Sequence, residues 1–353
     1  MKILLVKLSS LGDVVHTLPV VQDILAALPD AQIDWVVEPA FAPVLSLCPG
    51  VHRVVACDLR RWRKTPLASS TRLAYRAFKA QLQATAYNAV IDLQGLTKSA
   101  LVARLARLAP GGKRYALANQ TDGSGYEAPT RWVADVAIRM VPHVHAVQRS
   151  RALAARALGY RLAGLPDYGL KMSLAQKTRG LPAIENIADQ LPSNECLSNS
   201  VAFIHGTSRA DKEWPLAHWV ALGRRLHAAG YSVVLAHGNS AELATSQAIA
   251  SALNTASVIP AARVLPLLPL DALAPVLAAC TGVIGVDSGV SHLAVALDLP
   301  HVQIYNFDTA WRTGPESVGA SGVRQVSVFA QPVPGVQTVW QAWLECLCAG
   351  ASQ

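Results

Sequence analysis

The sequence predicts an α/β fold made of two Rossmann-like domains that face each other across a cleft. Three observations lead to this prediction. Apolar runs typical of strands alternate with helical patterns, the same alternation restarts near residue 200, and 353 residues exceed the usual size of one hydrophobic core. Since 52% of the residues are hydrophobic and 15% are charged, the chain is typical of a globular, core-rich protein.

The expected elements follow in chain order. Short apolar runs predict strands, and apolar residues recurring every three or four positions predict helices. In the first half we expect strands at residues 3–7, 33–38, 53–57 and 89–93, and helices at 14–28 and 71–84. In the second half we expect strands at 201–205, 232–237, 282–286 and 302–305, and helices at 216–229, at 241–253 and from about residue 271.

A polar stretch divides the two halves. Residues 181–200 contain Pro182, Pro192 and several Asn and Ser residues, a composition typical of a linker. We therefore expect an N-terminal domain at 1–180 and a C-terminal domain at 201–353. For the last helix, packing back on the N-terminal domain is an alternative expectation.

Three features bear on the location of the protein. Lys7 interrupts the apolar run after Met1, so no signal peptide is predicted and a cytoplasmic protein is expected. The apolar stretch 264–286 resembles a membrane span, but Pro269, Asp271 and Pro275 argue against a spanning helix. The six cysteines form no C-x-x-C pair and lie mostly in apolar stretches, as expected of reduced, buried thiols.

Several common site motifs are absent from the sequence. No G-x-G-x-x-G follows the first strand, and no G-x-x-x-x-G-K-[ST] loop occurs, so ordinary NAD enzymes and P-loop NTPases are disfavoured. No H-E-x-x-H motif occurs among the ten histidines, and we expect no metal site. Another phosphate-bearing ligand is compatible with this pattern.

The first strand leads into a Ser-Ser-Leu-Gly-Asp turn at residues 9–13. In open α/β sheets ligands bind at the carboxyl ends of the strands, so Asp13 is expected at the mouth of such a crevice. A carboxylate in the first turn of a helix also complements the helix dipole without any catalytic role. The turn alone leaves both interpretations open.

A second turn follows the expected strand at 282–286. It reads Asp-Ser-Gly-Val-Ser-His at 287–292, and the backbone N–H groups of Ser288, Gly289 and Val290 would open a helix there. Such amides form a cradle for a diphosphate. The serine is one position late for the G-x-S-x-G elbow of hydrolases, so nucleophilic serine chemistry is disfavoured. An ordinary strand-to-helix turn is the alternative.

A third turn follows the strand at 201–205. It brings the hydroxyl groups of Thr207 and Ser208 and the ammonium group of Lys212 to the start of a helix. Hydroxyl donors and a cation suit a leaving diphosphate, whose oxygens gain charge as a glycosidic bond breaks. A solvated, charged loop is the alternative, but a second such turn at an equivalent sheet end favours the ligand interpretation.

A basic cluster lies in the first domain. Four of the five residues at 60–64 are Arg or Lys, half of the formal net charge of +8. Such a concentration indicates an anionic partner. Because the cluster is single and short and no reader motif accompanies it, we expect no nucleic acid, and either a carboxylated or phosphorylated acceptor or an anionic membrane surface fits.

Five segments together resemble a known family. Residues 7–19, 60–64, 92–99, 207–215 and 286–293 resemble, in order and spacing, the lipopolysaccharide heptosyltransferases of glycosyltransferase family 9. The form of the first segment looks like that of heptosyltransferase I rather than heptosyltransferase II, which adds the second heptose.

The resemblance implies a glycosyltransferase B-type fold and an inverting reaction. The enzyme would transfer L-glycero-D-manno-heptose from ADP-heptose to the first Kdo of Kdo2-lipid A, without a metal or other cofactor. It would act at the cytoplasmic face of the inner membrane as a peripheral protein.

The resemblance also implies roles for individual residues. Asp13 matches the general base that takes the proton of the Kdo hydroxyl, and Lys212 matches the catalytic lysine on the donor phosphates. Glu242 falls where the family holds the adenosine ribose. The remaining donor-binding positions are Thr207, Ser208, Asp287, Ser288, Gly289, Val290 and His292. The acceptor-binding positions are Ser10, Gly12, Arg60, Arg61, Arg63, Lys64 and Lys98.

The chain departs from the family pattern at residues 305–309, which read Tyr-Asn-Phe-Asp-Thr where relatives commonly read Tyr-Gly-Pro-Thr. Other classes of function share the expected architecture. Another sugar-nucleotide glycosyltransferase, such as heptosyltransferase II, is the enzyme alternative; a nucleotide-sugar epimerase is disfavoured by the missing glycine fingerprint. A two-domain solute-binding protein is the non-enzyme alternative, although it should carry an export signal.

Overall fold

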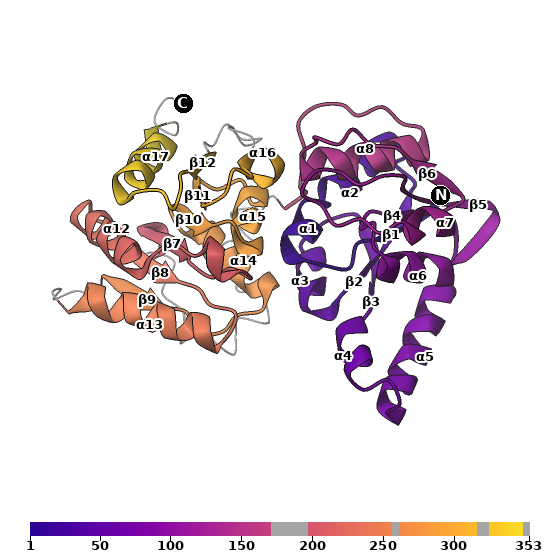
Figure 1. Cartoon of the computed structure of the whole chain (residues 1–353), viewed down its shortest axis with the longest axis horizontal. Helices are drawn as coiled ribbons and strands as arrows, with labels where there is room; N and C mark the ends of the chain where they lie inside the picture. The colour runs from indigo at the N-terminus through magenta and orange to yellow at the C-terminus, as the bar shows by residue number, and fades with distance from the viewer. Residues whose placement is uncertain (171–196, 256–260, 316–324, 349–353) are drawn as a thin grey trace. The chain divides into compact units, whose positions relative to one another are not determined.

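The computed structural model describes residues 1–170, 197–255, 261–315 and 325–348. The chain divides into two compact units, Met1–Gly169 and Leu170–Gln353 (Figure 1). The linker predicted at 181–200 lies almost wholly outside the described residues, and the first strand of the second unit begins at Ser200. The two units are described separately below.

The first unit is built on a six-stranded sheet in which every paired strand is parallel. The strand order is β3-β2-β1-β4-β5-β6, the order of the classical dinucleotide-binding folds, which reverses direction between β1 and β4. Its strands are β1 (Lys2–Val6), β2 (Gln32–Val37), β3 (Val51–Ala56), β4 (Ala86–Asp92), β5 (Arg107–Leu117) and β6 (Val136–Ile138).

Helices cover both faces of this sheet (Figure 1). One face packs on α5 and α6, and α2 packs beside α8 on the other. Residues 3–6 of β1 are therefore fully buried, as expected of a parallel strand covered on both sides. The helices are α1 (Leu11–Val15), α2 (Pro19–Ala27), α3 (Ala42–Ser46), α4 (Leu59–Lys64), α5 (Ser69–Gln83), α6 (Thr97–Leu105), α7 (Pro129–Val133) and α8 (Ala146–Leu158), with a 3-10 turn η1 (Pro39–Phe41).

The single helix predicted at 14–28 is wrong. The structure has two helices, α1 and α2, separated at residues 16–18. Pro19 occupies the first turn of α2, where its fixed φ and missing N–H favour the start of a helix over its continuation. The apolar spacing continues across the break, which is why periodicity alone did not reveal it.

The second unit repeats the same topology. Its strand order, β12-β11-β10-β7-β8-β9, is parallel throughout and reverses between β7 and β10. The strands are β7 (Ser200–Ile204), β8 (Ser232–Leu235), β9 (Ala262–Val264), β10 (Gly282–Val286), β11 (His301–Tyr305) and β12 (Gln325–Phe329). The two Rossmann-like domains predicted from the sequence are confirmed.

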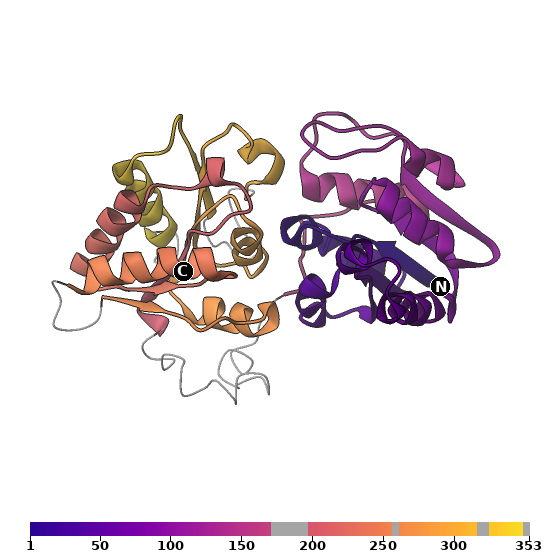
Figure 2. The same ribbon diagram turned by 60° about the horizontal axis from the view of Figure 1, so that its bottom comes forward.

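One face of this second sheet packs on α12, α13 and α17, and α14 and α15 contact β10 (Figures 1 and 2). The apolar face of α17 inserts Val339 and Trp343 into this core. The helices are α12 (Leu216–Ala228), α13 (Ser240–Asn254), α14 (Leu270–Ala279), α15 (Gly289–Ala296), α16 (Ala310–Thr313) and α17 (Val336–Cys348), with a 3-10 turn η3 (Ala210–Lys212).

The apolar stretch 264–286 forms a loop, α14 and β10, as expected from Asp271 and its prolines. Among the described residues, no helix combines the length and the hydropathy needed to cross a bilayer. Four cysteines have described side chains, Cys48, Cys57, Cys280 and Cys346; all are buried and none forms a disulfide.

Candidate functional site

Polar side chains gather where each sheet reverses its strand order. In the first unit the chain leaves β1 toward Asp13 and leaves β4 toward Lys98. In the second unit it leaves β7 toward Lys212 and leaves β10 toward Asp287. Ligands of open α/β sheets bind at this position, so each unit presents one candidate site.

Asp13 lies in the first turn of α1 and is held from two sides. Its Oδ2 atom accepts hydrogen bonds of 3.2 Å from both the backbone N–H and the hydroxyl group of Ser10. Its Oδ1 atom lies 3.3 Å from Nζ of Lys7, the residue that follows β1. The Lys7 side chain is only 2% exposed, whereas that of Asp13 is 38% exposed, so the carboxylate is open to a substrate while its cation is buried.

The electrostatics of this pair favour an ionised carboxylate. Burial raises the pKa of Asp13, but the nearby charges of Lys7 and Arg149 and the Ser10 N–H outweigh it, so the pKa lies below its ordinary value. Burial in turn lowers the pKa of Lys7, and Asp13 opposes that shift. Asp13 therefore completes the capping box that Ser10 begins at the start of α1, and its carboxylate has a fixed charge and orientation.

The segment after β4 supports the turn that carries Asp13. The side-chain oxygen of Gln94 accepts the backbone N–H groups of Leu8 (2.8 Å) and Ser9 (3.2 Å), and its amide group donates to the Ser9 carbonyl. Lys7 Nζ also donates to the carbonyl of Leu93 at 3.1 Å. The ends of β1 and β4 are thus joined by side-chain hydrogen bonds beneath the site.

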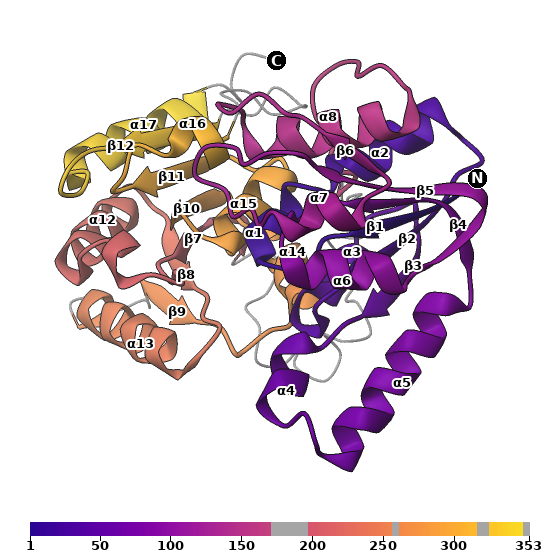
Figure 3. The same cartoon turned by 45° about the vertical axis from the view of Figure 1, so that its right-hand side comes forward.

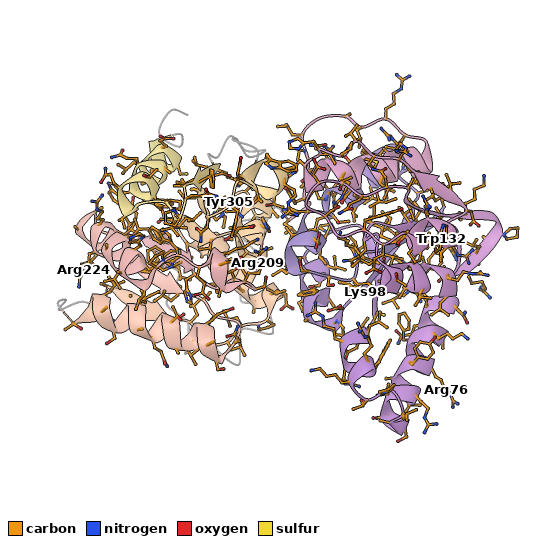
Figure 4. All side chains as sticks on the ribbon, in the orientation of Figure 1. Arg76, Lys98, Trp132, Arg209, Arg224 and Tyr305 are labelled. Atoms are coloured by element: carbon orange, nitrogen blue, oxygen red, sulfur yellow. The ribbon has the colours of Figure 1, made fainter. Side chains whose placement is uncertain are left out.

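A buried carboxylate, Glu38, joins two of the predicted acceptor-side cations. Its side chain is 5% exposed and lies 2.8 Å from Nε of Arg60 and 3.4 Å from Nζ of Lys98. Lys98, labelled in Figure 4, also donates to the Ser9 hydroxyl group at 2.8 Å. Glu38 therefore connects the basic cluster to the turn that precedes Asp13.

The other cations of the cluster lie on α4 and point to solvent. Arg61 is exposed and lies 3.6 Å from Asp58, whose side chain caps α4, and Arg63 and Lys64 are exposed. Gly12 is a buried residue within α1. The structure thus brings together Ser10, Asp13, Lys98 and Arg60 through shared partners, but it does not bring Arg61, Arg63 and Lys64 into this network.

In the second unit Asp287 is the centre of the candidate site. Its carboxylate is 7% exposed and pairs with Lys212 on one oxygen and with Nε2 of His292, at 3.3 Å, on the other. The Thr207 hydroxyl group donates to the Asp287 carbonyl at 3.3 Å. Burial raises the pKa of this carboxyl, but His292 and Lys212 outweigh the effect and hold the pKa well below its ordinary value.

The turn after β10 opens α15 as the sequence predicted. Ser288 is the N-cap, with its hydroxyl oxygen 3.4 Å from the backbone N–H of Ser291. Ser288, Gly289 and Val290 are partly exposed at this helix start, whereas Ser291 and His292 are buried. Position 285, in β10, requires glycine, because a Cβ at Gly285 would lie 2.3 Å from the Ser291 hydroxyl oxygen.

A pocket in the second unit includes Thr207, the residue whose hydroxyl group contacts Asp287. It is lined by Gly206 and Thr207 after β7, by Trp214, and by Asn239 and Glu242 at the start of α13. The Glu242 carboxylate accepts the Gly238 N–H at 2.6 Å and the Asn239 amide at 2.8 Å. A Cβ at Gly206 would lie 2.5 Å from this carboxyl group, so glycine allows the close approach. Ser208 is exposed next to the pocket.

The segment that departs from the family pattern packs on the loop of Lys212. The Asn306 side chain donates to the backbone carbonyls of Asp211 (3.2 Å) and Glu213 (2.9 Å), on either side of Lys212. The guanidinium group of Arg209 lies over the ring of Phe307, 5.5 Å from its centroid, and both Arg209 and Tyr305 are labelled in Figure 4. Residues 305–309 therefore position this loop.

Several of these residues could not be identified by sequence reasoning. Lys7 and Glu38 each lie at the carboxyl end of an expected strand. A charged residue is unusual there, and this position is the one sequence feature that could have marked them as site residues. Arg149, on α8, is buried and donates to the Thr121 hydroxyl group at 2.9 Å, and no local pattern relates it to Asp13. Across the described ranges, no three His, Cys, Asp or Glu side chains gather in a metal-binding arrangement.

Comparison with known proteins adds independent evidence. The sequence model of the family described as Glycosyltransferase family 9 (heptosyltransferase) matches residues 75–336. Lipopolysaccharide heptosyltransferase 1 of Pseudomonas aeruginosa is 38% identical over 92% of this chain and 83% of its own length. The enzyme of the same name from Escherichia coli K12 is 35% identical over 92% of each chain.

The fold agrees with a solved structure titled E. coli heptosyltransferase WaaC with ADP. That structure superimposes with a TM-score of 0.81 at 31% sequence identity and covers 98% of this chain and 99% of the other. The structural similarity covers nearly the whole length of the chain and therefore includes both units.

Proposed function

The chain belongs to glycosyltransferase family 9, the heptosyltransferases, and from this premise we propose that it transfers heptose to the inner core of lipopolysaccharide. The donor is ADP-L-glycero-D-manno-heptose and the acceptor is the first Kdo of Kdo2-lipid A. Near-full-length relatives named heptosyltransferase 1 support this acceptor over the second heptosyltransferase step. Membership of an enzyme family overturns the solute-binding alternative.

The single observation that carries the mechanism is the exposed carboxylate of Asp13 held against the buried ammonium group of Lys7. Asp13 is the general base: it accepts the proton of the Kdo hydroxyl as that oxygen attacks the anomeric carbon of heptose. A carboxylate of lowered pKa is a weak base. It suffices because the hydroxyl becomes acidic only as its bond to the oxocarbenium-like carbon forms. Attack from the face opposite the diphosphate inverts the configuration.

The leaving ADP is stabilised by the second unit. Lys212 donates to the phosphate oxygens while its bond to Asp287 keeps the ammonium group at the start of α15. The amides of Ser288, Gly289 and Val290 add the positive end of the helix dipole. Asp287 and His292 position Lys212, since a carboxylate would repel the phosphates directly.

The pocket lined by Glu242 is the proposed site of the adenosine. A carboxylate held by two N–H donors retains lone pairs that can accept the ribose hydroxyl groups. Thr207 lines this pocket and contacts Asp287, and the hydroxyl groups of Thr207 and the exposed Ser208 are proposed to donate to the diphosphate. No metal or other cofactor is assigned, because Lys212 and the amides supply the positive charge that a leaving diphosphate requires.

The acceptor is proposed to bind at the first unit. Its Kdo carboxylates and lipid A phosphates are anionic, and Arg60, Arg61, Arg63, Lys64 and Lys98 offer cations from α4 and α6. Because the acceptor is a lipid, we place the protein at the cytoplasmic face of the inner membrane as a peripheral enzyme. No nucleic acid partner is assigned.

One experiment tests this function. The purified protein is incubated with ADP-heptose and de-acylated Kdo2-lipid A, and the product is analysed by mass spectrometry with and without a chelator. We expect a product heavier by one heptose under both conditions. The absence of a heptosylated product would contradict the proposed reaction, and loss of the product only with chelator would contradict the metal-free assignment.

A further inference from the structure

A basic arm extends from the first unit and is only partly used by the proposed reaction. It consists of residues 59–83, which form α4, a short connection and α5. Between residues 59 and 84 the chain has seven Lys or Arg residues and no Asp or Glu. Figures 1 and 3 show α5 reaching past the sheet of its own unit. Three of the seven cations, Arg72, Arg76 and Lys79, have no role in the proposed acceptor site.

The inner side of the arm is a packed aromatic cluster. Trp62 of α4 contacts Phe78 and Tyr75 of α5, with ring centroids 5.4 and 5.8 Å apart. Trp62, Phe78 and Leu82 are buried. The orientation of α5 is therefore fixed by its core contacts, and the opposite face is held toward solvent.

The outer face of α5 combines apolar and cationic side chains. At 100° per residue, Leu73, Ala77 and Ala80 fall on one side of the helix, opposite Phe78 and Leu82. Arg72, Arg76 and Lys79 flank that apolar side, and all six of these outward residues are exposed. Arg76 is labelled near the outer end of α5 in Figure 4.

Two leucines on the arm are unusually exposed for their type. Leu73 is 70% exposed, and Leu67, in the connection between the helices, is 83% exposed. Transferring such side chains from water to an apolar environment is favourable in free energy. Phosphate groups of a nucleic acid would explain the cations but would leave both leucines in water.

We propose that the basic arm docks on an anionic lipid bilayer. Arg72, Arg76 and Lys79 pair with the headgroup phosphates, and Leu67 and Leu73 enter the interface between headgroups and acyl chains. The inference rests on the proposed lipid-linked acceptor. It divides the arm in two, with the outer face of α5 binding the bilayer and the cations of α4 remaining available to the acceptor headgroup.

The test compares two triple variants with the same change in charge. The arm variant carries Arg72→Gln, Arg76→Gln and Lys79→Gln. The control carries Arg161→Gln, Arg224→Gln and Arg263→Gln, three exposed cations outside the arm. Binding is measured by flotation with vesicles of phosphatidylcholine alone and with vesicles containing phosphatidylglycerol. For the anionic vesicles we expect the arm variant to bind at least about 10-fold more weakly, and the control within about two-fold of the wild type.

A second variant separates the apolar contribution. Leu67→Ser with Leu73→Ser should weaken binding to anionic vesicles at every salt concentration, whereas high salt should release the wild type by screening its charges. Equal losses in the arm and control triples would overturn the proposal, as would equal binding of the wild type to both kinds of vesicle. Loss of duplex DNA binding without loss of vesicle binding in the arm variant would also overturn it.

Activity distinguishes this inference from the proposed function. The arm variant should transfer heptose normally to de-acylated Kdo2-lipid A in solution and at least about 10-fold more slowly to the intact acceptor in anionic vesicles. If the wild type bound vesicles through the arm but used neither acceptor, the proposed function would fail and the docking surface would stand. If the arm variant used the vesicle acceptor as fast as the wild type, docking by α5 would be wrong.

Discussion

Nζ of Lys7 lies 3.3 Å from Oδ1 of Asp13, at the point where β1 ends and the site begins. The cation is buried and the carboxylate is accessible, so in the proposed reaction Lys7 is assigned a positioning role that acts through Asp13. The same carboxylate caps α1 through Ser10. Helix capping and the proposed proton transfer therefore require the same orientation of the carboxylate, so the two roles considered for Asp13 are compatible.

The Lys7→Met variant tests this coupling. Because Lys7 is one of the charges that lower the pKa of Asp13, its loss should raise that pKa. The acidic limb of the pH–rate profile for heptosyl transfer should therefore move to higher pH. We also expect kcat at alkaline pH to fall about 10- to 100-fold, since the carboxylate loses one of its anchors. An acidic limb at the wild-type pH would show that Lys7 does not control Asp13.

Asp13→Asn tests the general base directly. The amide keeps the size of the side chain but cannot accept the proton, so kcat should fall by about 10²- to 10⁴-fold. Affinity for ADP, measured by calorimetry, should change little, because the donor is assigned to the second unit. Near-normal turnover would contradict the base assignment, and loss of ADP binding would point to a structural defect.

Lys212→Ala tests the stabilisation of the leaving group. Charge develops on the diphosphate in the transition state, so the loss should appear mainly in kcat, by roughly 10- to 1000-fold. Asp287→Asn keeps the ammonium group but removes its charged partner, and a smaller loss is expected. If KM for ADP-heptose rises in Lys212→Ala while kcat stays constant, Lys212 contributes to ground-state binding alone.

Asn306 provides a test of the segment that departs from the family. Asn306→Ala removes two hydrogen bonds that hold the backbone on either side of Lys212, so we expect both weaker ADP affinity and lower kcat. Asn254→Ala is the matched control, because that side chain also joins two segments, through the backbone of Ala262, but outside the site. Each variant should lose about 1 to 2 kcal/mol of unfolding free energy. Equal ADP affinity in the two variants would contradict a positioning role for Asn306.

Local pattern predicted the strands that carry the site but not the contacts that organise it. The turns after β1, β7 and β10 were identified because strand, small residue and helix start are adjacent in the sequence. Glu38 was placed at the end of a strand, but its bonds to Arg60 and Lys98 join three separate elements. The break before Pro19 was missed because apolar spacing continues through it. Such features depend on tertiary packing, which periodicity does not encode.

The same limit applies to Asp92. Its position at the end of β4 does not predict the pKa of its carboxyl group. Its side chain accepts the N–H groups of Gln94 and Gly95 and the Ser99 hydroxyl group. Burial nevertheless raises its pKa from 3.8 to about 6. The folded protein thus holds a proton on this carboxyl group between these pH values, whereas the unfolded chain releases it.

The sign of the resulting pH dependence follows from linkage. Where the folded state binds more protons than the unfolded state, the free energy of unfolding declines as pH rises. The contribution of Asp92 is therefore fully present below about pH 4 and is lost as pH approaches about 6. Asp13 and Asp287, with lowered pKa values, give the opposite trend, so only a difference between variant and wild type isolates Asp92.

Asp92→Asn should remove this pH-dependent contribution to the free energy of unfolding while preserving the fold. The amide oxygen can accept the same two backbone N–H groups. The amide nitrogen can donate to the Ser99 oxygen once the Ser99 hydroxyl hydrogen turns from Asp92 to the Leu96 carbonyl, its other acceptor. Relative to the wild type, the variant should gain about 2 kcal/mol of unfolding free energy between pH 4.5 and 7.5, measured by urea denaturation. A difference that stays constant across this range would show that the carboxylate is ionised throughout, stabilised by its three donors despite its burial.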